Sequence, residues 1–483
     1  MENLSSRTTV VASLALIFEA RTTAGRLRGT SEAGVAVFRG IPFAAPPVGE
    51  LRFAAPAPPR PWDGVRDARE FGPAPPQAGA FGMNRLMGGE DWLTLNVWSP
   101  DPGRDAGLPV MVWFHGGGYG VGASGMPEYD GARLARDGVV VVTFNYRVGI
   151  EGFAHLEGAP ANRGLLDQVA ALEWVRDSIR GFGGDPGSVT VFGQSAGAGS
   201  IAALLAMPRA AGLFHRAVAQ SVPGTFFTPE LARDIAGACA AEVGLTATAA
   251  DLATVDPELL PAAGDEVMAK MGTHVERWGR AAHRSILFAP VVDGEVLPTT
   301  PWQARPGVDL LVGHTRDEHR LFTAFLGEPT SEQVATAVEV FAPRPYPAAE
   351  PTALYEWIFS DWLFRMPSLH LAERAAERSH VYELTWSGVL GACHGLDVPL
   401  VFGNLTGSQP AALIVDLAAA EAVSALMRAA WIAFATTGDP GWPTFDSGLV
   451  QIFDTEPVVA PYPETTSRTI WQDHTFPPLP LRS

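Results

Sequence analysis

The chain has 483 residues, of which 47% are apolar, and a formal net charge of −18, so it is long enough to bury one large core or two ordinary ones. Such an acidic chain is not expected to bind nucleic acid or an anionic membrane surface, because both require clustered positive charge. Lys270 is the only lysine, which excludes a Walker-type phosphate loop, and Cys239 and Cys393 are too few for a disulfide framework or a cysteine-rich metal site.

The N-terminal segment is interpreted as a leader or an extra segment over residues 1–20, followed by one domain over residues 21–483. An apolar run from Val10 to Phe18 has the size of a signal-peptide core. However, Phe18 and Glu19 interrupt the small-residue pattern that a cleavage site needs, so secretion is the weaker alternative. The run is too short to span a bilayer, and no membrane insertion is expected.

Several apolar runs predict buried strands. In these runs apolar and polar residues do not alternate, as they would in a strand with one exposed face. In chain order these runs are residues 109–114, 139–144, 189–192, 217–220 and 309–313. Residues 164–179 place Leu165, Val169, Leu172 and Val175 at helical spacing. Continuous apolar strands alternating with helices predict an α/β fold, with an open and mostly parallel sheet flanked by helices. Ligands bind such sheets at the carboxyl ends of the strands.

A glycine-rich loop, FHGGGYGVGASG over residues 114–125, follows the first of these strands. Successive glycines let backbone N–H groups converge, which is typical of an anion hole. A plain glycine loop is the alternative. Gly120, Gly122 and Gly125 also match a dinucleotide fingerprint, but no acidic residue follows at the ribose-binding distance, which argues against that cofactor.

The third predicted strand leads into FGQSAGA, with Ser195 between Gly193 and Gly197. Glycines on both sides of a serine allow a sharp strand-to-helix turn that holds the hydroxyl out at the sheet edge. The same pattern also occurs in ordinary glycine-rich turns, so this window alone does not decide between the two.

A general base and an acid follow later in the chain. An α/β-hydrolase places its nucleophile, acid and histidine in that order, with the last two on loops after later strands. Glu318 lies just beyond the strand at 309–313, and His394 follows HVYELTW, so order and setting both fit. Most of the 11 histidines are expected to be structural or surface residues.

Along nearly the whole chain, ordered motifs resemble the type-B carboxylesterase family, which includes the cholinesterases. The motifs are FRGIPFAAPPVGELRF (38–53), EDWLTLNVW (90–98), HGGGY (115–119), NYRVGIEGF (145–153), GLLDQ (164–168), GGDPGSVTVFGQSAGA (183–198), GHTRDE (313–318) and HGLDVPLVFGN (394–404). The resemblance implies an α/β-hydrolase fold with insertions at about 224–300 and 322–380 over the site. It implies no metal and no cofactor.

The same resemblance assigns roles to individual residues. Ser195 would be the nucleophile, His394 the general base and acid, and Glu318 its orienting carboxylate. The N–H groups of Gly117, Gly118 and Ala196 would form the oxyanion hole. Ser221 could support the carboxylate, although an ordinary strand-end serine is nearly as good an interpretation. Two ion pairs, Arg39 with Glu90 and Arg147 with Asp167, would hold loops beside the site.

Several positions depart from the family pattern. Trp92 stands where many secreted members have cysteine, and the missing disulfide favours a reducing compartment and a cytoplasmic protein. Gln194 replaces a common glutamate, and no tryptophan lies between Trp62 and Trp92, which makes choline esters an unfavourable substrate. Glu318 is followed by His319 and Arg320 in place of glycine, either narrowing the entrance or facing solvent.

The predicted function is that of a serine carboxylesterase acting on small-molecule, uncharged carboxylic esters. Amides or carbamates are the alternative substrates, and a non-catalytic protein on the same fold is the alternative class. The oligomeric state cannot be deduced from the sequence. Candidate pocket residues, although such residues belong to the core more often than to a pocket, are Phe226, Phe227, Trp278, Phe288 and Phe322.

Overall fold

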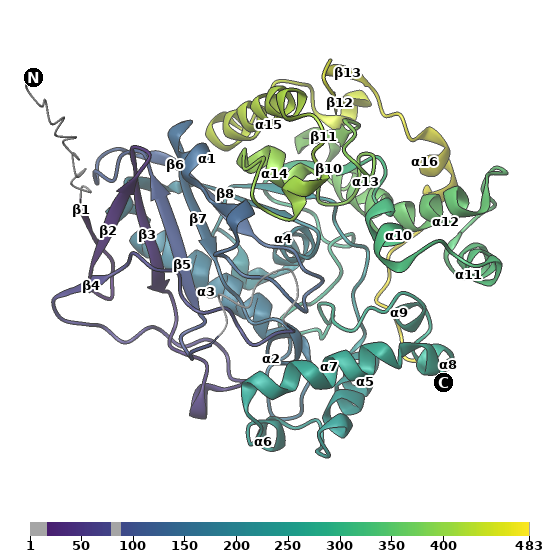
Figure 1. Ribbon diagram of the computed structural model, residues 1–483, viewed down its shortest axis with the longest axis horizontal. Coiled ribbons are helices and arrows are strands. Elements are labelled where there is room, and N and C mark those ends of the chain that lie inside the picture. The colour runs from purple at the N-terminus through teal and green to yellow at the C-terminus, as the bar shows by residue number, and fades with distance from the viewer. Residues whose placement is uncertain (1–16, 79–87, 483) are drawn as a thin grey trace, which may run out of the picture.

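The computed structural model describes residues 17–78 and 88–482, and its centre is one large twisted sheet with helices on both faces (Figure 1). The strand order is β1 (Ile17–Arg21), β2 (Arg26–Glu32), β3 (Val35–Pro42), β5 (Thr94–Ser99), β7 (Val140–Phe144), β6 (Leu108–Phe114), β8 (Gly184–Gln194), β9 (Arg216–Gln220), β10 (Asp309–Thr315), β11 (Ser379–Leu384), β12 (Leu449–Phe453) and β13 (Val458–Pro461), with β4 (Val65–Asp67) beside β2. All neighbours from β7 to β12 are parallel. The predicted α/β fold is therefore confirmed.

Strand β6 illustrates why its sequence is apolar without alternation. Val110, Val112 and Phe114 enter the hydrophobic core on one face of the sheet, and Met111 and Trp113 enter the core on the other face. Successive side chains of a strand point to opposite faces, so a strand covered on both sides needs apolar residues at every position. Four of the five predicted runs lie within strands of this kind, and the run at 139–144 begins one residue before β7.

Helices cover the two faces and continue the chain between the strands. Those outside the large insertions are α1 (Ala132–Arg136), α2 (Gly149–Phe153), α3 (Arg163–Ser178), α4 (Ala196–Ala206), α14 (Asp397–Phe402), α15 (Leu417–Thr437) and α16 (Thr465–Trp471). Among the described residues, α15 is the one helix long and apolar enough to cross a membrane by length and composition. Its Met427 and Trp431 are fully buried in the core, as in the central helix of a globular domain.

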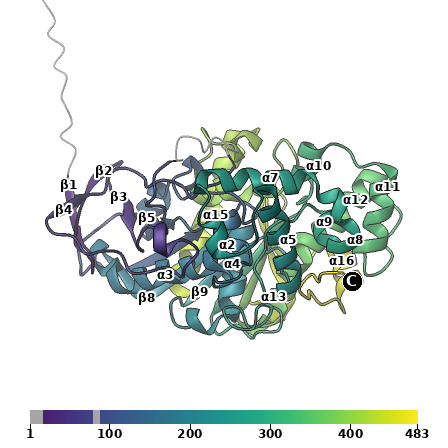
Figure 2. The same cartoon turned by 90° about the horizontal axis from the view of Figure 1, so that it is seen from below.

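Two helical insertions interrupt the parallel strands. Between β9 and β10 lie α5 (Pro229–Glu242), α6 (Ala249–Leu252), α7 (Leu260–Ala269), α8 (Val275–Trp278) and α9 (Arg280–His283), and between β10 and β11 lie α10 (Arg320–Leu326), α11 (Ser331–Thr336), α12 (Pro351–Ser360) and α13 (Met366–Glu373). In both views α9, α11 and α12 lie at the end of the molecule away from β1 (Figures 1 and 2). Arg280 donates to the carbonyl of Val340, and Arg284 donates to Tyr355 Oη. The two insertions therefore meet near the strand ends.

The N-terminal boundary expected after residue 20 falls inside a strand. Ile17–Arg21 forms β1, which pairs antiparallel with β2 at the edge of the sheet. Backbone hydrogen bonding to β2 makes residues 17–20 part of the domain, so the leader interpretation is wrong for them. The rest of that expectation concerns residues 1–16, which lie outside the described residues.

Of the two expected ion pairs, one is present. Arg147 binds Asp167 through two nitrogens at 2.8 and 2.7 Å, and both side chains are fully buried. The Arg39 pairing is wrong, because Arg39 binds Glu32 at 2.5 and 2.7 Å while Glu90 is exposed. The neighbouring antiparallel strand β2 supplies the carboxylate that Arg39 needs.

Candidate active site

Ser195 occupies a sharp turn between β8 and α4. Its φ of 57° and ψ of −125° are strained for a residue with a side chain. A Cβ on Gly193 would lie 2.8 Å from the carbonyl oxygen of Phe114, and a Cβ on Gly197 would overlap the same oxygen. The two glycines therefore let strand β6 pass directly beside the turn. The backbone of Ser195 is held by a 2.9 Å bond from its N–H to the carbonyl of Gln220.

Three backbone N–H groups lie beside Ser195 with no acceptor. Gly117 and Gly118 have φ values of 112° and 60°, which glycine adopts without strain. Among the described residues, the N–H groups of Gly117, Gly118 and Ala196 donate to no other group. All three residues line the same cavity as Ser195. A set of free donors of this kind can bind an oxygen that gains negative charge.

His394 and Glu318 come together from the loops after β11 and β10. His394 Nδ1 lies 2.5 Å from Glu318 Oε2. The other carboxylate oxygen accepts hydrogen bonds from Ser221 Oγ at 2.6 Å and from the N–H of Thr315 at 2.9 Å. Burial alone would raise the pKa of Glu318, but the neighbouring His394 and these donors hold that pKa below its ordinary value. Glu318 is therefore a buried carboxylate, ionised and fixed in orientation.

The side chain of Gln194 contacts the other nitrogen of His394. Its Nε2 lies 3.1 Å from His394 Nε2. Because His394 Nδ1 faces the carboxylate of Glu318, Nε2 is the acceptor and the Gln194 amide donates to it. Ser195 Oγ makes no hydrogen bond to any described residue, although Ser195 and His394 line the same cavity. The Gln194 amide thus contacts His394 Nε2, the nitrogen to which Ser195 was expected to donate a hydrogen bond.

The cavity in front of these residues has a volume of about 660 Å³ and mostly apolar walls. Of the predicted pocket residues, Phe288 and Phe322 line it. Phe364 also lines it and stacks on His394, with ring centroids 4.1 Å apart. Phe364 lies within the predicted insertion, but no motif marks it, and a lone phenylalanine cannot be told from a core residue by spacing.

The other three predicted pocket residues are core residues, and their assignment to the pocket is wrong. Phe226 packs edge-on against Trp302, and Phe227 bridges Val291 and Leu479 through its backbone. Trp278 stacks on His274 and donates its indole N–H to Asp234. These contacts lie within the first insertion or join it to Trp302 and Leu479, and none of the three side chains lines the cavity.

The two residues after Glu318 behave differently from each other. His319 is 1% exposed, and its imidazole ring packs against the aromatic rings of Phe322, Tyr355 and Phe359. Arg320 is exposed and pairs with Asp317 and Glu356 on the surface. Neither side chain lines the cavity, so neither one narrows its entrance.

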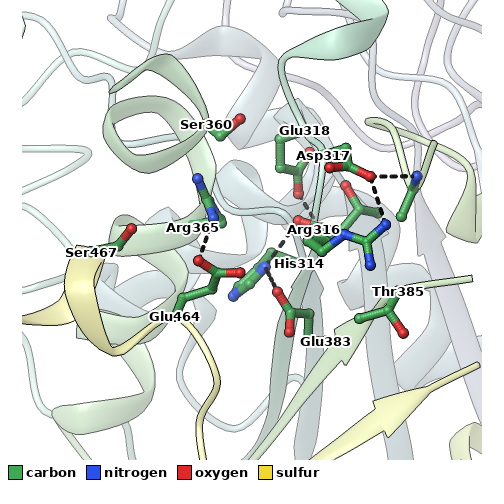
Figure 3. A network of polar contacts seen from close by, with 12 residues as sticks. His314, Arg316, Asp317, Glu318, Ser360, Arg365, Glu383, Thr385, Glu464 and Ser467 are labelled. Atoms are coloured by element: carbon green, nitrogen blue, oxygen red, sulfur yellow. Dashed lines mark hydrogen bonds and ion pairs between the residues drawn. The ribbon is translucent and has the colours of Figure 1, made fainter. Parts of the chain in front are cut away.

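A buried polar network lies behind Glu318 (Figure 3). Arg365 binds Glu464 at 2.9 Å, and His314 Nδ1 lies 4.0 Å from Glu383 Oε1. Burial, followed by the charge of Glu464, raises the pKa of Glu383 to about 8, against the opposing effect of Arg365. Glu383 therefore carries a proton at neutral pH.

Replacing Glu383 with glutamine is expected to stabilise the protein selectively at alkaline pH. Between pH 4.5 and about 8 the folded chain holds a proton on Glu383 that the unfolded chain has released, so stability falls as pH rises through that range. Thermal unfolding midpoints at about pH 6 and about pH 9 measure the effect, and the fall should be smaller in Glu383→Gln. Glu332→Gln, on an exposed glutamate, is the control. If the unfolding midpoint falls equally between the two pH values in the unsubstituted protein, Glu383→Gln and Glu332→Gln, the assignment of a bound proton to Glu383 is refuted.

Comparison with known proteins agrees with this geometry. The model of the Carboxylesterase family matches residues 18–342. Para-nitrobenzyl esterase of Bacillus subtilis is 38% identical over 92% of this chain and 96% of that protein, and fumonisin B1 esterase of Sphingopyxis macrogoltabida is 37% identical over 88% and 84%. A carboxylesterase structure from Geobacillus stearothermophilus superposes with a TM-score of 0.84 at 34% identity, over 94% of this chain and all of that one. The chain has the α/β-hydrolase fold of these esterases, hydrolyses carboxylic esters, and belongs to the carboxylesterase family.

Proposed function

We propose that this protein is a serine carboxylesterase that hydrolyses uncharged carboxylic esters through an acyl-enzyme, with Ser195, His394 and Glu318 as its triad. The observation that carries the proposal is the 2.5 Å contact between His394 and the buried Glu318, in a cavity that also holds Ser195 and three unpaired N–H donors. A histidine fixed in this tautomer presents its other nitrogen as a base. The apolar walls of the cavity favour uncharged acyl and alcohol groups.

In the first half of the reaction the ester acylates the enzyme. His394 Nε2 takes the proton of Ser195 Oγ as that oxygen forms a bond to the ester carbonyl carbon. The carbonyl oxygen becomes an oxyanion and accepts hydrogen bonds from Gly117, Gly118 and Ala196. The carbon–oxygen bond to the alcohol then breaks, and His394 returns the proton to the departing alkoxide. Glu318 stabilises the imidazolium throughout.

In the second half water releases the acid. His394 takes a proton from a water molecule whose oxygen attacks the acyl carbonyl, and the same three N–H groups hold the second oxyanion. The bond to Ser195 Oγ breaks, Oγ receives the proton, and the carboxylic acid leaves. Both halves require Ser195 Oγ to reach His394 Nε2, so the Gln194 amide must move away from that nitrogen during the reaction. Such contacts are often loose without substrate and tighten in the complex.

A rapid-mixing experiment with 4-nitrophenyl butyrate tests the proposal. Nitrophenol is released on acylation, before water attacks, so an acyl-enzyme gives a burst of roughly one equivalent per active site when deacylation is the slower half. The matched anilide of butyric acid should turn over more slowly, because an amine is a poorer leaving group than a phenol. Absence of hydrolysis with every uncharged ester tried would refute the proposal.

A further inference from the structure

Arg284 is a positively charged residue at the edge of the ester cavity, and it has no negatively charged partner in the described part of the chain. It follows α9 in the first insertion and lines the same cavity as Ser195 and His394. Within residues 17–78 and 88–482 no carboxylate lies at ion-pair distance from its guanidinium. Burial lowers its pKa, and the tyrosine beside it raises it only in part. Arg284 is half-buried, and a partly desolvated guanidinium without a counter-charge costs free energy that an anionic ligand in the cavity would offset.

The partners that Arg284 does have are all neutral. Its Nη1 donates to Tyr355 Oη at 2.9 Å, and its Nη2 donates to His319 Nε2 at 2.6 Å. The guanidinium lies over the ring of Phe359, with 4.0 Å between its central carbon and the ring centroid. A guanidinium carries five N–H donors, and these bonds use two of them. The buried Nε has no partner among the described residues.

His319 accepts from Arg284 as a neutral imidazole. Burial, the charge of Arg284 and the nearby His394 all hold the pKa of His319 well below its ordinary value. Its Nδ1 faces Thr323 Oγ1 at 3.3 Å, which leaves Nε2 as the acceptor for the arginine. His319 therefore orients the guanidinium without sharing any negative charge with it.

The acidic residues of the cavity do not neutralise Arg284. Glu151 pairs with Arg52 at 2.6 Å. Burial raises the pKa of Glu128 and of Asp265, which disfavours their charged forms. Neither of these two carboxylates forms an ion pair with any described residue. The positive charge of Arg284 is therefore left for a group that enters the cavity.

We propose that Arg284 binds a free carboxylate on either the acyl or the alcohol part of the ester substrate, so that esters carrying such a carboxylate are hydrolysed in this cavity as well as uncharged ones. This inference rests on the proposed esterase activity and extends it from uncharged esters to esters with a remote anionic group. A guanidinium held by Tyr355 and His319 is preoriented, and its remaining N–H groups match the two oxygens of a carboxylate. The apolar walls hold the chain between the carboxylate and the reacting carbonyl.

The test compares matched pairs of esters. In the acyl arm, mono-4-nitrophenyl adipate is compared with 4-nitrophenyl hexanoate, which has the same number of acyl carbons and no charge. In the alcohol arm, the butyrate ester of 4-(hydroxymethyl)benzoic acid is compared with benzyl butyrate. In Arg284→Gln the ratio of kcat/KM for the charged to the uncharged ester should fall roughly 10- to 100-fold in at least one arm, as for a lost charged hydrogen bond. The kcat/KM of the uncharged ester should change little.

Control variants separate recognition from a structural role. Arg320→Gln removes an exposed arginine next to His319 that does not line the cavity, and its ratios should match those of the unsubstituted enzyme. Arg284→Lys keeps the charge and should recover part of the preference. If Arg284→Gln fails to fold, the lysine variant replaces it in the test. In addition, competitive inhibition of the unsubstituted enzyme by adipate is compared with inhibition by hexanoate, and adipate should inhibit more strongly.

Failure of the inference about Arg284 can be told apart from failure of the proposed esterase function. Equal losses for charged and uncharged esters in Arg284→Gln, or unchanged ratios in both arms, would overturn the assignment while leaving the esterase activity in place. Absence of turnover with all four esters in the unsubstituted enzyme would instead overturn the proposed function itself.

Discussion

Replacing Ser195 with alanine is expected to lower kcat/KM for 4-nitrophenyl butyrate by at least roughly 10⁴-fold, because it removes the oxygen proposed to form the acyl-enzyme. The residual rate would come from the cavity and from the free N–H groups of Gly117, Gly118 and Ala196. Alanine is smaller than serine and keeps the β-carbon at the strained turn, so the fold should persist. Initial rates at substrate concentrations well below KM, with thermal unfolding of the same samples, measure both effects.

Ser331→Ala is the matched control for this substitution. Ser331 is an exposed serine at the first position of α11, and its side chain does not line the cavity. Its replacement should leave kcat/KM within roughly twofold of the unsubstituted enzyme, as surface substitutions away from special features do. A Ser195→Ala protein that keeps a tenth of its activity or more would contradict the assignment of the nucleophile.

Replacing Glu318 with glutamine is the second large effect, and it is expected to lower kcat by roughly 10³- to 10⁴-fold. The amide offers His394 Nδ1 a donor where the carboxylate offered an acceptor, which favours the tautomer with the proton on Nε2. That tautomer cannot take the proton of Ser195. The amide also faces two donors, Ser221 Oγ and the N–H of Thr315, which both point at Glu318 Oε1.

The effect of Glu318→Gln should appear in kcat with little change in KM, because the residue does not line the cavity. Glu356→Gln is the control, since Glu356 is a partly exposed glutamate on α12 that pairs with Arg320. A Glu318→Gln enzyme with a raised KM and an unchanged kcat would show that Glu318 acts on substrate binding, against the proposed role.

The sheet could be predicted from the sequence because each parallel strand is covered on both faces. The run at 139–144 is apolar apart from Thr143, and its residues 140–144 form β7, in which every residue is buried. β1 was missed because its residues Ile17–Arg21 alternate between exposed and buried at a sheet edge, where the apolar signal is weak. The leader interpretation of residues 17–20 followed from that weak signal.

The turn at Ser195 could be predicted because its geometry restricts residue type. Gly193 and Gly197 lie against the carbonyl of Phe114, so the contact itself excludes side chains. The walls of the cavity could not be predicted in the same way. Phe226 and Phe322 are equally apolar in sequence, and only the path of the insertions decides that one packs on Trp302 and the other lines the cavity.

The orientations of single side chains could not be predicted from the sequence either. The amide of Gln194 contacts His394, and Arg39 binds Glu32 in place of Glu90, because both outcomes depend on which partner lies within reach after folding. The sequence marked His319 as a departure but gave no indication that it holds Arg284. That contact joins the two insertions across 35 residues of the chain.

The most direct measurement is the site of covalent capture by a fluorophosphonate, a reagent that phosphorylates activated serines. The enzyme is labelled to completion, digested, and its peptides are identified by mass spectrometry. One adduct is expected, on the peptide that contains Ser195; it should form in step with the loss of ester hydrolysis and be absent from Ser195→Ala. An adduct on another residue that tracks the loss of activity, or full hydrolysis by an enzyme that stays unlabelled, would contradict it.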